Sequence, residues 1–177
     1  MHADMFFAPI LIAIHLWVMP GAPAWLDFSI AGYSLAYDKS HSQALIHDRK
    51  SGFYLKREID CDGALITLEL TRDRHEISGE LSDATTPEIR GAQEKPLRNL
   101  KTGKGVKIGD GPDKLTERLG KPSKTERSGS RRQFLDHVYI WKSKPNGGAP
   151  VTYTETYTFK NGALIQVVFF RDATADQ

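Results

Sequence analysis

The sequence predicts an α+β fold, in which an antiparallel β-sheet carries a few short helices on one face and two related halves follow each other in tandem. Three observations support this prediction: runs of alternating polar and apolar residues, turn dipeptides that follow these runs, and one well-bounded helical segment. The length of 177 residues suits one domain or two small halves that share a core.

The clearest strands belong to two hairpins of the same kind. Val151 to Lys160 places threonines on one face and mostly apolar residues on the other, which is the period of a β-strand. Asn161-Gly162 follows this run, and Asp62-Gly63 follows the strand-like run Phe53 to Asp60; both dipeptides favour two-residue hairpin turns. The next strand, Ala163 to Phe170, is apolar on both faces, so we expect it at the centre of a sheet.

The two hairpins also share a sequence repeat. Asp62 to Asp73 reads DGALITLELTRD and Asn161 to Asp172 reads NGALIQVVFFRD, with a constant offset of 99 residues. Six of the twelve aligned positions are identical, which favours duplication over chance similarity. The repeat is therefore the basis for predicting two related halves.

The best helix signal lies between Pro112 and Leu119. A Gly-Asp-Gly turn precedes Pro112, which suits the first turn of a helix, and Gly120 ends the segment. Leu115 and Leu119 then share one face, because they are four positions apart. A weaker helix is predicted from about Lys39 to His47.

Further strands and a division of the chain complete the predicted architecture. The further strands are Leu26 to Leu35, Glu76 to Ser82 and Gln133 to Trp141. The division is a signal peptide at 1–24, a first half at 25–82, a linker at 83–104, a second half at 105–172 and a tail at 173–177.

The first segment is predicted to be an export signal. Met5 to Met19 is apolar apart from a proline and a histidine, and Ala22-Pro23-Ala24 places small residues where a signal peptidase requires them. We therefore expect cleavage after Ala24 and a periplasmic or extracellular location. The alternative is a retained membrane anchor, but a helix over Met5 to Met19 is about 22 Å long, short of the roughly 30 Å apolar core of a bilayer.

The segment Thr102 to Pro122 combines a strand end, a short helix and a closing turn, and it reads TGKGVKIGDGPDKLTERLGKP. Strands follow it, with Tyr-Thr-Phe-Lys-Asn-Gly at the last turn. This pattern resembles the unit found in β-lactamase-inhibitor-like proteins and in small outer-membrane assembly lipoproteins, over Thr102 to Asp172 and more loosely over Leu26 to Ser82.

The resemblance implies a short helical segment packed on an antiparallel sheet, with two units in tandem as in the inhibitors. It also implies an exported, non-enzymatic protein that binds other proteins. The chain lacks the lipidated cysteine of the lipoproteins, and no inhibitory contact residue transfers by position.

The sequence contains no familiar catalytic or metal-binding motif. His75-Glu76 lacks the second histidine of a zinc protease motif, because position 79 is glycine. Gly103-Lys104 is followed by glycine rather than serine or threonine, so the glycines here are interpreted as turn formers and not as a phosphate loop. The acidic neighbours of Cys61 disfavour a reactive thiolate. We predict no catalytic residue, metal or cofactor, and the question of enzymatic activity stays open with a preference against it.

Two candidate binding surfaces follow from the distribution of charge and aromatic residues. Lys101 to Arg132 holds ten basic and four acidic residues, whereas Phe53 to Arg90 holds five basic and nine acidic ones. The first candidate is a basic patch that faces an acidic partner or envelope polymer, and its members are Arg118, Lys121, Arg131 and Arg132. The second is an aromatic sheet face with Tyr139, Trp141, Tyr153 and Tyr157. Solvated surface for the basic residues and core packing for the aromatic ones are the alternatives.

The leading functional prediction is a non-enzymatic protein-binding module of the cell envelope or periplasm, whose partner is another envelope or exported protein. The net charge of +2 gives no reason to expect a nucleic-acid partner, and membrane contact is expected only through the N-terminal segment. The alternatives are an envelope-polymer hydrolase with a site assembled from distant residues, and a structural accessory of envelope assembly. A partly buried cluster of His, Asp or Glu in a cleft would favour the hydrolase.

Overall fold

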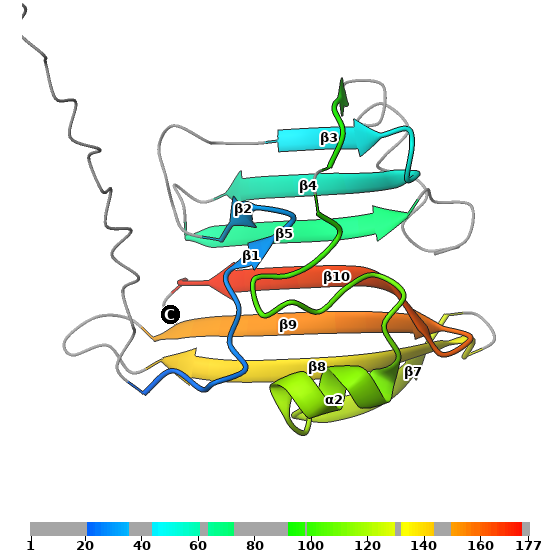
Figure 1. The fold of residues 1–177 in the computed structure, drawn as a ribbon. Helices are drawn as coiled ribbons and strands as arrows, with labels where there is room; N and C mark the ends of the chain where they lie inside the picture. The colour runs from blue at the N-terminus through cyan, green and yellow to red at the C-terminus, as the bar shows by residue number, and fades with distance from the viewer. Residues whose placement is uncertain are drawn as a thin grey trace, which may run out of the picture.

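A computed structural model shows one eight-stranded sheet with a second layer of segments on one of its faces (Figure 1). It describes residues 21–35, 44–60, 64–72, 92–97, 99–129, 132–143 and 150–174. The strand order is β6-β3-β4-β5-β10-β9-β8-β7. The bounds are β3 (Ala44–Asp48), β4 (Phe53–Asp60), β5 (Leu65–Arg72), β6 (Gln93–Glu94), β7 (Lys124–Ser128), β8 (Phe134–Ser143), β9 (Val151–Lys160) and β10 (Ala163–Asp172).

Neighbouring strands of this sheet pair antiparallel, except that β6 pairs parallel with β3. The predicted hairpins are confirmed as β4–β5 and β9–β10, and the predicted strand from Gln133 is confirmed as β8. At the second turn Asn161 and Gly162 have φ of 52° and 78°, the conformation for which this dipeptide is suited. The sheet is therefore mostly antiparallel, with one parallel pair at its edge.

The two hairpins meet at the centre of the sheet through β5 and β10. Glu69 lies directly opposite Val168, which is its counterpart in the sequence repeat. Near the turns the hairpins have the same register, since Leu65 pairs with Asp60 and Leu164 pairs with Phe159. The prediction that the strand after Asn161-Gly162 is central is confirmed.

The second layer covers one face of the sheet (Figure 1). It contains the short hairpin β1 (Ser29–Ile30) and β2 (Tyr33–Ser34), the extended segment from β6 to residue 111, and the helix α2 (Pro112–Leu119). Apolar side chains fill the space between the layers, where each buried aliphatic or aromatic residue stabilises the fold by about 2 kcal/mol. The sheet contributes Leu55, Ile66, Leu68, Leu70, Tyr157, Phe159, Val167 and Phe169, and the second layer contributes Ile30, Leu35, Val106, Leu115 and Leu119.

The predicted helix is confirmed in both its bounds and its buried face. Gly111 precedes the helix in an extended conformation, and Pro112 occupies the first turn. Gly120 has φ of 82° and donates its N–H to the carbonyl of Thr116, as expected at a helix C-terminus. Leu115 and Leu119 are the buried residues of the helix, so the amphipathic pattern sets which face packs on the sheet.

The predicted helix from Lys39 to His47 is wrong over its described part. Residues 44–48 form β3, which pairs with β4 in register from Ala44 opposite Arg57 to Asp48 opposite Phe53. Backbone pairing with β4 outweighs the weak helical pattern, because local propensity yields to tertiary context. The predicted strand Leu26 to Leu35 is instead the β1–β2 hairpin, which turns at Ala31 and Gly32 with positive φ at both residues.

Several predictions fall on residues outside the described ranges. These are the signal segment up to residue 20, the first hairpin turn at 62–63, Cys61, the strand from Glu76 to Ser82, and Arg131. The expected linker is described at 92–97 and 99–104, where Leu97 and Leu100 pack against the core. Over the part of the chain that the structure covers, no helix has the length and hydropathy of a membrane-crossing segment.

Candidate functional site

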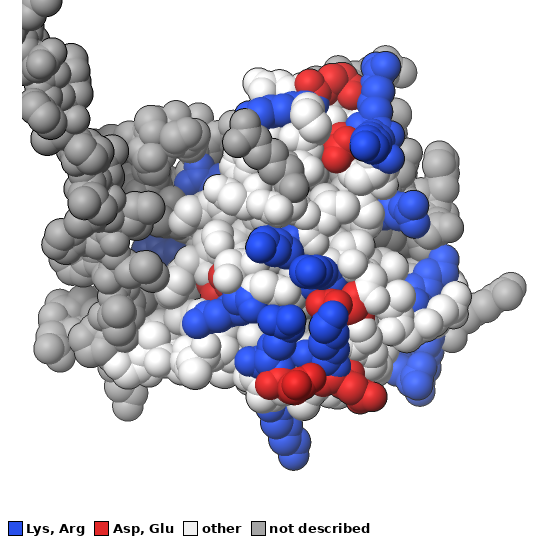
Figure 2. Space-filling view, viewed as in Figure 1, with Lys and Arg blue, Asp and Glu red and all other residues white. Residues whose placement is uncertain are grey.

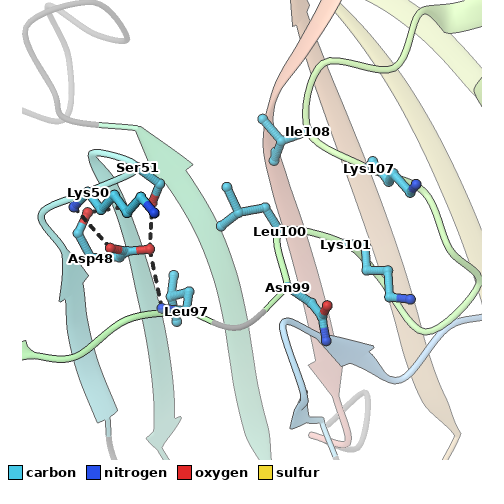
Figure 3. Close-up of a pocket in the computed structure, with 9 residues that line it drawn as sticks. All are labelled: Asp48, Lys50, Ser51, Leu97, Asn99, Leu100, Lys101, Lys107 and Ile108. Atoms are coloured by element: carbon cyan, nitrogen blue, oxygen red, sulfur yellow. Dashed lines mark hydrogen bonds between the residues drawn. The ribbon is translucent and has the colours of Figure 1, made fainter.

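A groove with a volume of about 540 Å³ lies between the β3–β4 turn and the segment that precedes α2 (Figure 3). Its polar lining residues are Asp48, Lys50, Ser51, Asn99, Lys101 and Lys107, and its apolar ones are Leu97, Leu100 and Ile108. The groove opens on the face that carries the second layer. Figure 2 shows that lysine and arginine side chains gather over the middle and lower part of this face.

One side of the groove is formed by residues 99–108, here called the lysine loop. The loop doubles back on itself, because Thr102 donates its N–H to the carbonyl of Val106 at 2.9 Å and Gly105 donates to Thr102 at 2.9 Å. Val106 and Thr102 are buried beneath the loop, so the lysines on either side of the turn remain exposed. The glycine-rich sequence therefore builds a tight turn, as predicted, with φ of 80° at Gly105.

Lys101 and Lys107 lie directly opposite each other on an antiparallel bridge of this loop. Their side chains extend in the same direction, next to each other and away from Lys50, which lies on the other side of the groove (Figure 3). Like charges directly opposite each other on paired strands are destabilising. The arrangement therefore has an electrostatic cost that a bound anion between the two ammonium groups would relieve.

No carboxylate of the described residues lies within salt-bridge distance of Lys50, Lys101 or Lys107. Asp48 also lines the groove, but its carboxylate is hydrogen-bonded to groups of the β3–β4 turn and to Leu97. Its carboxylate accepts hydrogen bonds from the Ser51 hydroxyl at 2.9 Å, the Lys50 N–H at 3.0 Å and the Leu97 N–H at 3.3 Å. The Ser51 hydroxyl, with the two N–H groups, holds the pKa of Asp48 below its ordinary value. Asp48 thus fixes the β3–β4 turn, and no carboxylate of the described residues forms an ion pair with these lysines.

The floor between the lysines is apolar. Leu97, Leu100 and Ile108 are half-buried and pack against the main core with one side while they line the groove with the other. A floor of this kind favours aliphatic or aromatic groups, which gain about 25 cal/mol for each Å² removed from water. The groove is therefore suited to a ligand that combines negative charge with apolar groups.

The tip of the lysine loop is fastened to the N-terminal segment by Asp27. The carboxylate of Asp27 accepts the N–H of Lys104 at 2.5 Å through Oδ2, and Oδ1 accepts the N–H groups of Phe28 and Ser29. An ideal Cβ on Gly103 would lie 2.5 Å from Asp27 Oδ1 and 2.6 Å from Ser29 Oγ. Only glycine fits at this position, so the approach of the two segments is specified by the sequence.

Asp27 is itself held by Glu155 on β9. Oε1 of Glu155 accepts the N–H of Asp27 at 2.5 Å, and Oε2 accepts the hydroxyl of Tyr157 at 2.8 Å. Glu155 is 1% exposed and Asp27 is 4% exposed. Burial, together with the nearby charge of Asp27, raises the pKa of Glu155 to about 8, so the group is mostly protonated at neutral pH.

These two carboxyl groups do not form an open catalytic site. Both are closed off from solvent, and the groove has a separate set of lining residues. Among the described residues, no three His, Cys, Asp or Glu side chains lie together as metal ligands would. The partly buried acid cluster in a cleft that would have favoured a hydrolase is therefore not formed by Asp27 and Glu155.

The expected aromatic binding face is not formed by the predicted residues. Tyr139, Tyr153 and Tyr157 are 0–2% exposed on the face of the sheet that the second layer covers. Trp141 is half-buried and stacks on Tyr153 with a centroid distance of 5.4 Å. The prediction placed these residues on the open face of the sheet, whereas they lie on the covered face. The alternation along β8 and β9 separates the two faces but does not indicate which of them the second layer covers.

The predicted basic patch is only partly brought together. Arg118 lies over the lysine loop, since an ideal Cβ on Gly105 would be 3.3 Å from its Nη1. Lys121 and Arg132 are both exposed, but Lys121 precedes β7 in the chain and Arg132 follows it. The two residues are therefore separated by a five-residue strand about 17 Å long. Arg118 therefore extends the basic face around the lysine loop, and Arg132 does not belong to it.

Sequence reasoning missed the central residues of this site. Lys101 and Lys107 lay within the basic stretch that was identified, and their positions on either side of a glycine turn were a signal for pairing. Lys50 reaches the groove only through tertiary packing, so no local pattern identified it. Comparison with models of protein families, with curated proteins and with solved structures finds no match to this chain.

Proposed function

We propose that this protein is a non-enzymatic binding module of the cell envelope or periplasm, and that its groove binds an acidic, partly apolar segment of another exported protein. The observation that carries the proposal is the pair Lys101 and Lys107, which face each other without a carboxylate among the described residues to neutralise them. The signal-like segment at 1–24 supports the exported location.

The groove favours a ligand with two chemical features. Carboxylates match the lysines at the rim, and aliphatic side chains match the floor of Leu97, Leu100 and Ile108. An extended peptide supplies both when acidic and apolar residues alternate along it, because successive side chains of a strand point to opposite sides. An anionic envelope polymer shares the negative charge but lacks the apolar side chains. The apolar floor should therefore add to the binding energy of a peptide and not to that of a polymer.

We infer that the two hairpins arose by duplication, as in the tandem family that the sequence resembles. The identical register near their turns and the position of Glu69 opposite its counterpart Val168 support this inference. This pairing is the one that a local two-fold axis between the two residues would produce. The groove lies away from this junction, since none of its lining residues is on β5 or β10.

The test is a binding titration with a labelled peptide of alternating glutamate and leucine. Each surface charge contact contributes about 0.2–1 kcal/mol, and reversal replaces an attraction by a repulsion. We therefore expect Lys107→Glu to weaken binding by about fivefold to tenfold. The matched control is Lys142→Glu, which makes the same change of charge at an exposed position of β8.

The control decides between a specific groove and general attraction to a basic protein. Lys142 alternates with the inward-facing Tyr139 and Trp141, so it lies on the other face of the sheet from the groove. Equal loss of affinity in both variants would contradict the proposal. A peptide of glutamate alone that binds as tightly as the alternating peptide would favour the polymer as partner.

A further inference from the structure

We propose that the proton on Glu155 keeps the N-terminal segment and the lysine loop closed on the sheet, and so controls the groove. The inference deepens the proposed function, because the regulated site is the one assigned there. It rests on a continuous series of hydrogen bonds that starts at a buried carboxyl group and ends at the loop that carries Lys101 and Lys107.

The first part of this series joins the sheet to the N-terminal segment. Glu155 on β9 accepts the main-chain N–H of Asp27, 128 positions away in the sequence. Within the segment, Leu35 donates its N–H to the carbonyl of Phe28. The Phe28 ring makes an edge contact with Tyr153 of β9, with a centroid distance of 5.8 Å. The bond to Glu155 is therefore one side-chain hydrogen bond from the sheet to this segment; a second is donated by Arg57 Nε of β4 to the carbonyl of Ser34 at 3.0 Å.

The second part joins the N-terminal segment to the lysine loop. Asp27 accepts the N–H of Lys104, Gly103 donates its N–H to Ser29 at 2.9 Å, and Ala31 donates to the carbonyl of Lys101 at 2.9 Å. An added Cβ at Gly103 would overlap the side chains of Asp27 and Ser29, so the two segments are in close contact at this point. A displacement of the N-terminal segment therefore displaces the loop as well.

The groups around Glu155 determine what its ionisation does. Tyr157 on the same strand donates a hydrogen bond to it, and Tyr139 on β8 lies directly opposite it on the paired strand. On the other side β10 places the apolar Phe169 opposite it. Asp27 faces it from the N-terminal segment, and Lys104 is the one cation among the described residues that acts on it, from an exposed position.

Loss of the proton would therefore place two buried carboxylates against each other. Burial raises the pKa of Tyr139 to about 12 and raises that of Tyr157 well above its ordinary value, so neither tyrosine titrates with Glu155. A buried charge without a close cation costs several kcal/mol unless water reaches it. When Asp27 and its neighbours leave the sheet, water reaches Glu155, and the lysine loop is no longer held in its closed position.

The direction of the effect follows from the pKa of about 8 for Glu155. The closed arrangement keeps the proton up to about pH 8, whereas the exposed carboxyl of the open arrangement loses it near its ordinary pKa of 4.5. Between these values each pH unit shifts the balance toward the open arrangement by up to about tenfold, and above pH 8 the balance levels off because both arrangements are ionised. Acidic ligands are therefore expected to bind most tightly in mildly acidic conditions and progressively more weakly as the pH rises to 8.

The experiment measures hydrogen-exchange protection of the Asp27 and Lys104 amides in the full-length chain, with intrinsic exchange rates divided out, between pH 5 and pH 8. The full-length chain is used because a chain cut after Ala24 would carry a free amino group at Trp25, which would titrate close to Asp27. The variants are Glu155→Gln, which keeps the shape and an acceptor oxygen, and the control Glu58→Gln, whose half-buried carboxylate pairs with Lys56 at 2.7 Å. Binding of the glutamate–leucine peptide is measured in the same samples.

We expect protection of both amides to fall about tenfold from pH 6 to pH 7 in the wild type and in the Glu58→Gln control, and to stay constant in Glu155→Gln. Equal loss in wild type and Glu155→Gln would overturn the proposal. If protection follows this pattern but no peptide binds at any pH, the proton-controlled closure stands and the proposed function fails. If peptide binds with the same pH dependence in wild type and Glu155→Gln, the proposed function stands and the control by Glu155 is refuted.

Discussion

The side-chain amide of Gln166 donates a 2.7 Å hydrogen bond to the carboxylate of Glu69 across the junction of the two hairpins. These residues lie on β10 and β5, the central pair of strands, and on the face of the sheet opposite the second layer. The bond joins the two repeated units at a point where the main chain pairs them as well. It gives a direct measure of how strongly the halves depend on each other.

A double-mutant cycle over Gln166→Ala and Glu69→Ala isolates this contact. We expect a coupling energy of about 0.5–1.5 kcal/mol, measured by urea denaturation, because a partly exposed hydrogen bond retains only a modest net contribution. A single cooperative transition is expected in all variants, since one core is shared by both halves. Two separated transitions, or a coupling energy near zero, would contradict a shared core at this junction.

The buried carboxyl of Glu155 predicts a specific pH dependence of stability. Its pKa is about 8 in the folded protein and near 4.5 when exposed, so the folded state holds a proton that the unfolded state has lost between these values. Stability from this group is therefore complete below pH 4.5 and falls by about 1.4 kcal/mol for each pH unit up to pH 8. Glu155→Gln should remove that slope.

Urea denaturation of wild type and Glu155→Gln at several pH values tests this prediction. The two free energies of unfolding should differ progressively as the pH rises from 5 to 8, in favour of the variant. Other groups titrate in both proteins and cancel in the difference. A difference that stays constant over this range would show that Glu155 has an ordinary pKa.

The approach of the lysine loop to the N-terminal segment predicts an unusual sensitivity at Gly103. A methyl group there would overlap Asp27 Oδ1 and Ser29 Oγ, so Gly103→Ala should destabilise the fold by about 1–3 kcal/mol. Gly111→Ala is the matched control, since its added Cβ would meet only the Gly162 carbonyl at an ordinary 3.5 Å. The control should lose no more than about 1 kcal/mol from the helix cap. Equal losses would mean that the two segments are not closely packed.

The opposed lysines predict that stability and binding respond in opposite directions. Lys107→Glu places a carboxylate opposite Lys101 and should raise the free energy of unfolding by about 0.2–1 kcal/mol, because an opposite-charge pair replaces a like-charge pair. The same substitution should weaken peptide binding. Thermal denaturation beside the binding titration checks both, and a variant that loses stability together with affinity would remove the argument for a functional pair.

The sequence was informative wherever a local pattern determines local structure. The alternation of Val151 to Lys160, the Asn161-Gly162 turn and the proline and glycine that bound Pro112 to Leu119 each predicted the observed element. These signals depend on residues within one or two turns of each other, and packing elsewhere in the chain does not change their meaning.

Contacts between distant segments were the part that local patterns did not predict. β3 was expected as a helix because its partner β4 cannot be recognised from the residues 44–48 alone. The tyrosines of β8 and β9 were placed on an open face, whereas the N-terminal segment and the lysine loop cover them. The same difficulty hid the groove, since Lys50 and Lys107 are far apart in sequence and line one groove only because the lysine loop lies beside the β3–β4 turn.

The most direct test of the central claim is a chemical-shift map. Isotope-labelled protein is titrated with the glutamate–leucine peptide at pH 7, and shifts of the backbone amides are followed. Binding in the groove predicts saturable shifts confined to residues 99–108 and to the turn at Lys50 and Ser51, with no response along the threonines of β9. Shifts centred on those threonines, or no saturable shift at all, would contradict the assignment of the groove as the binding site.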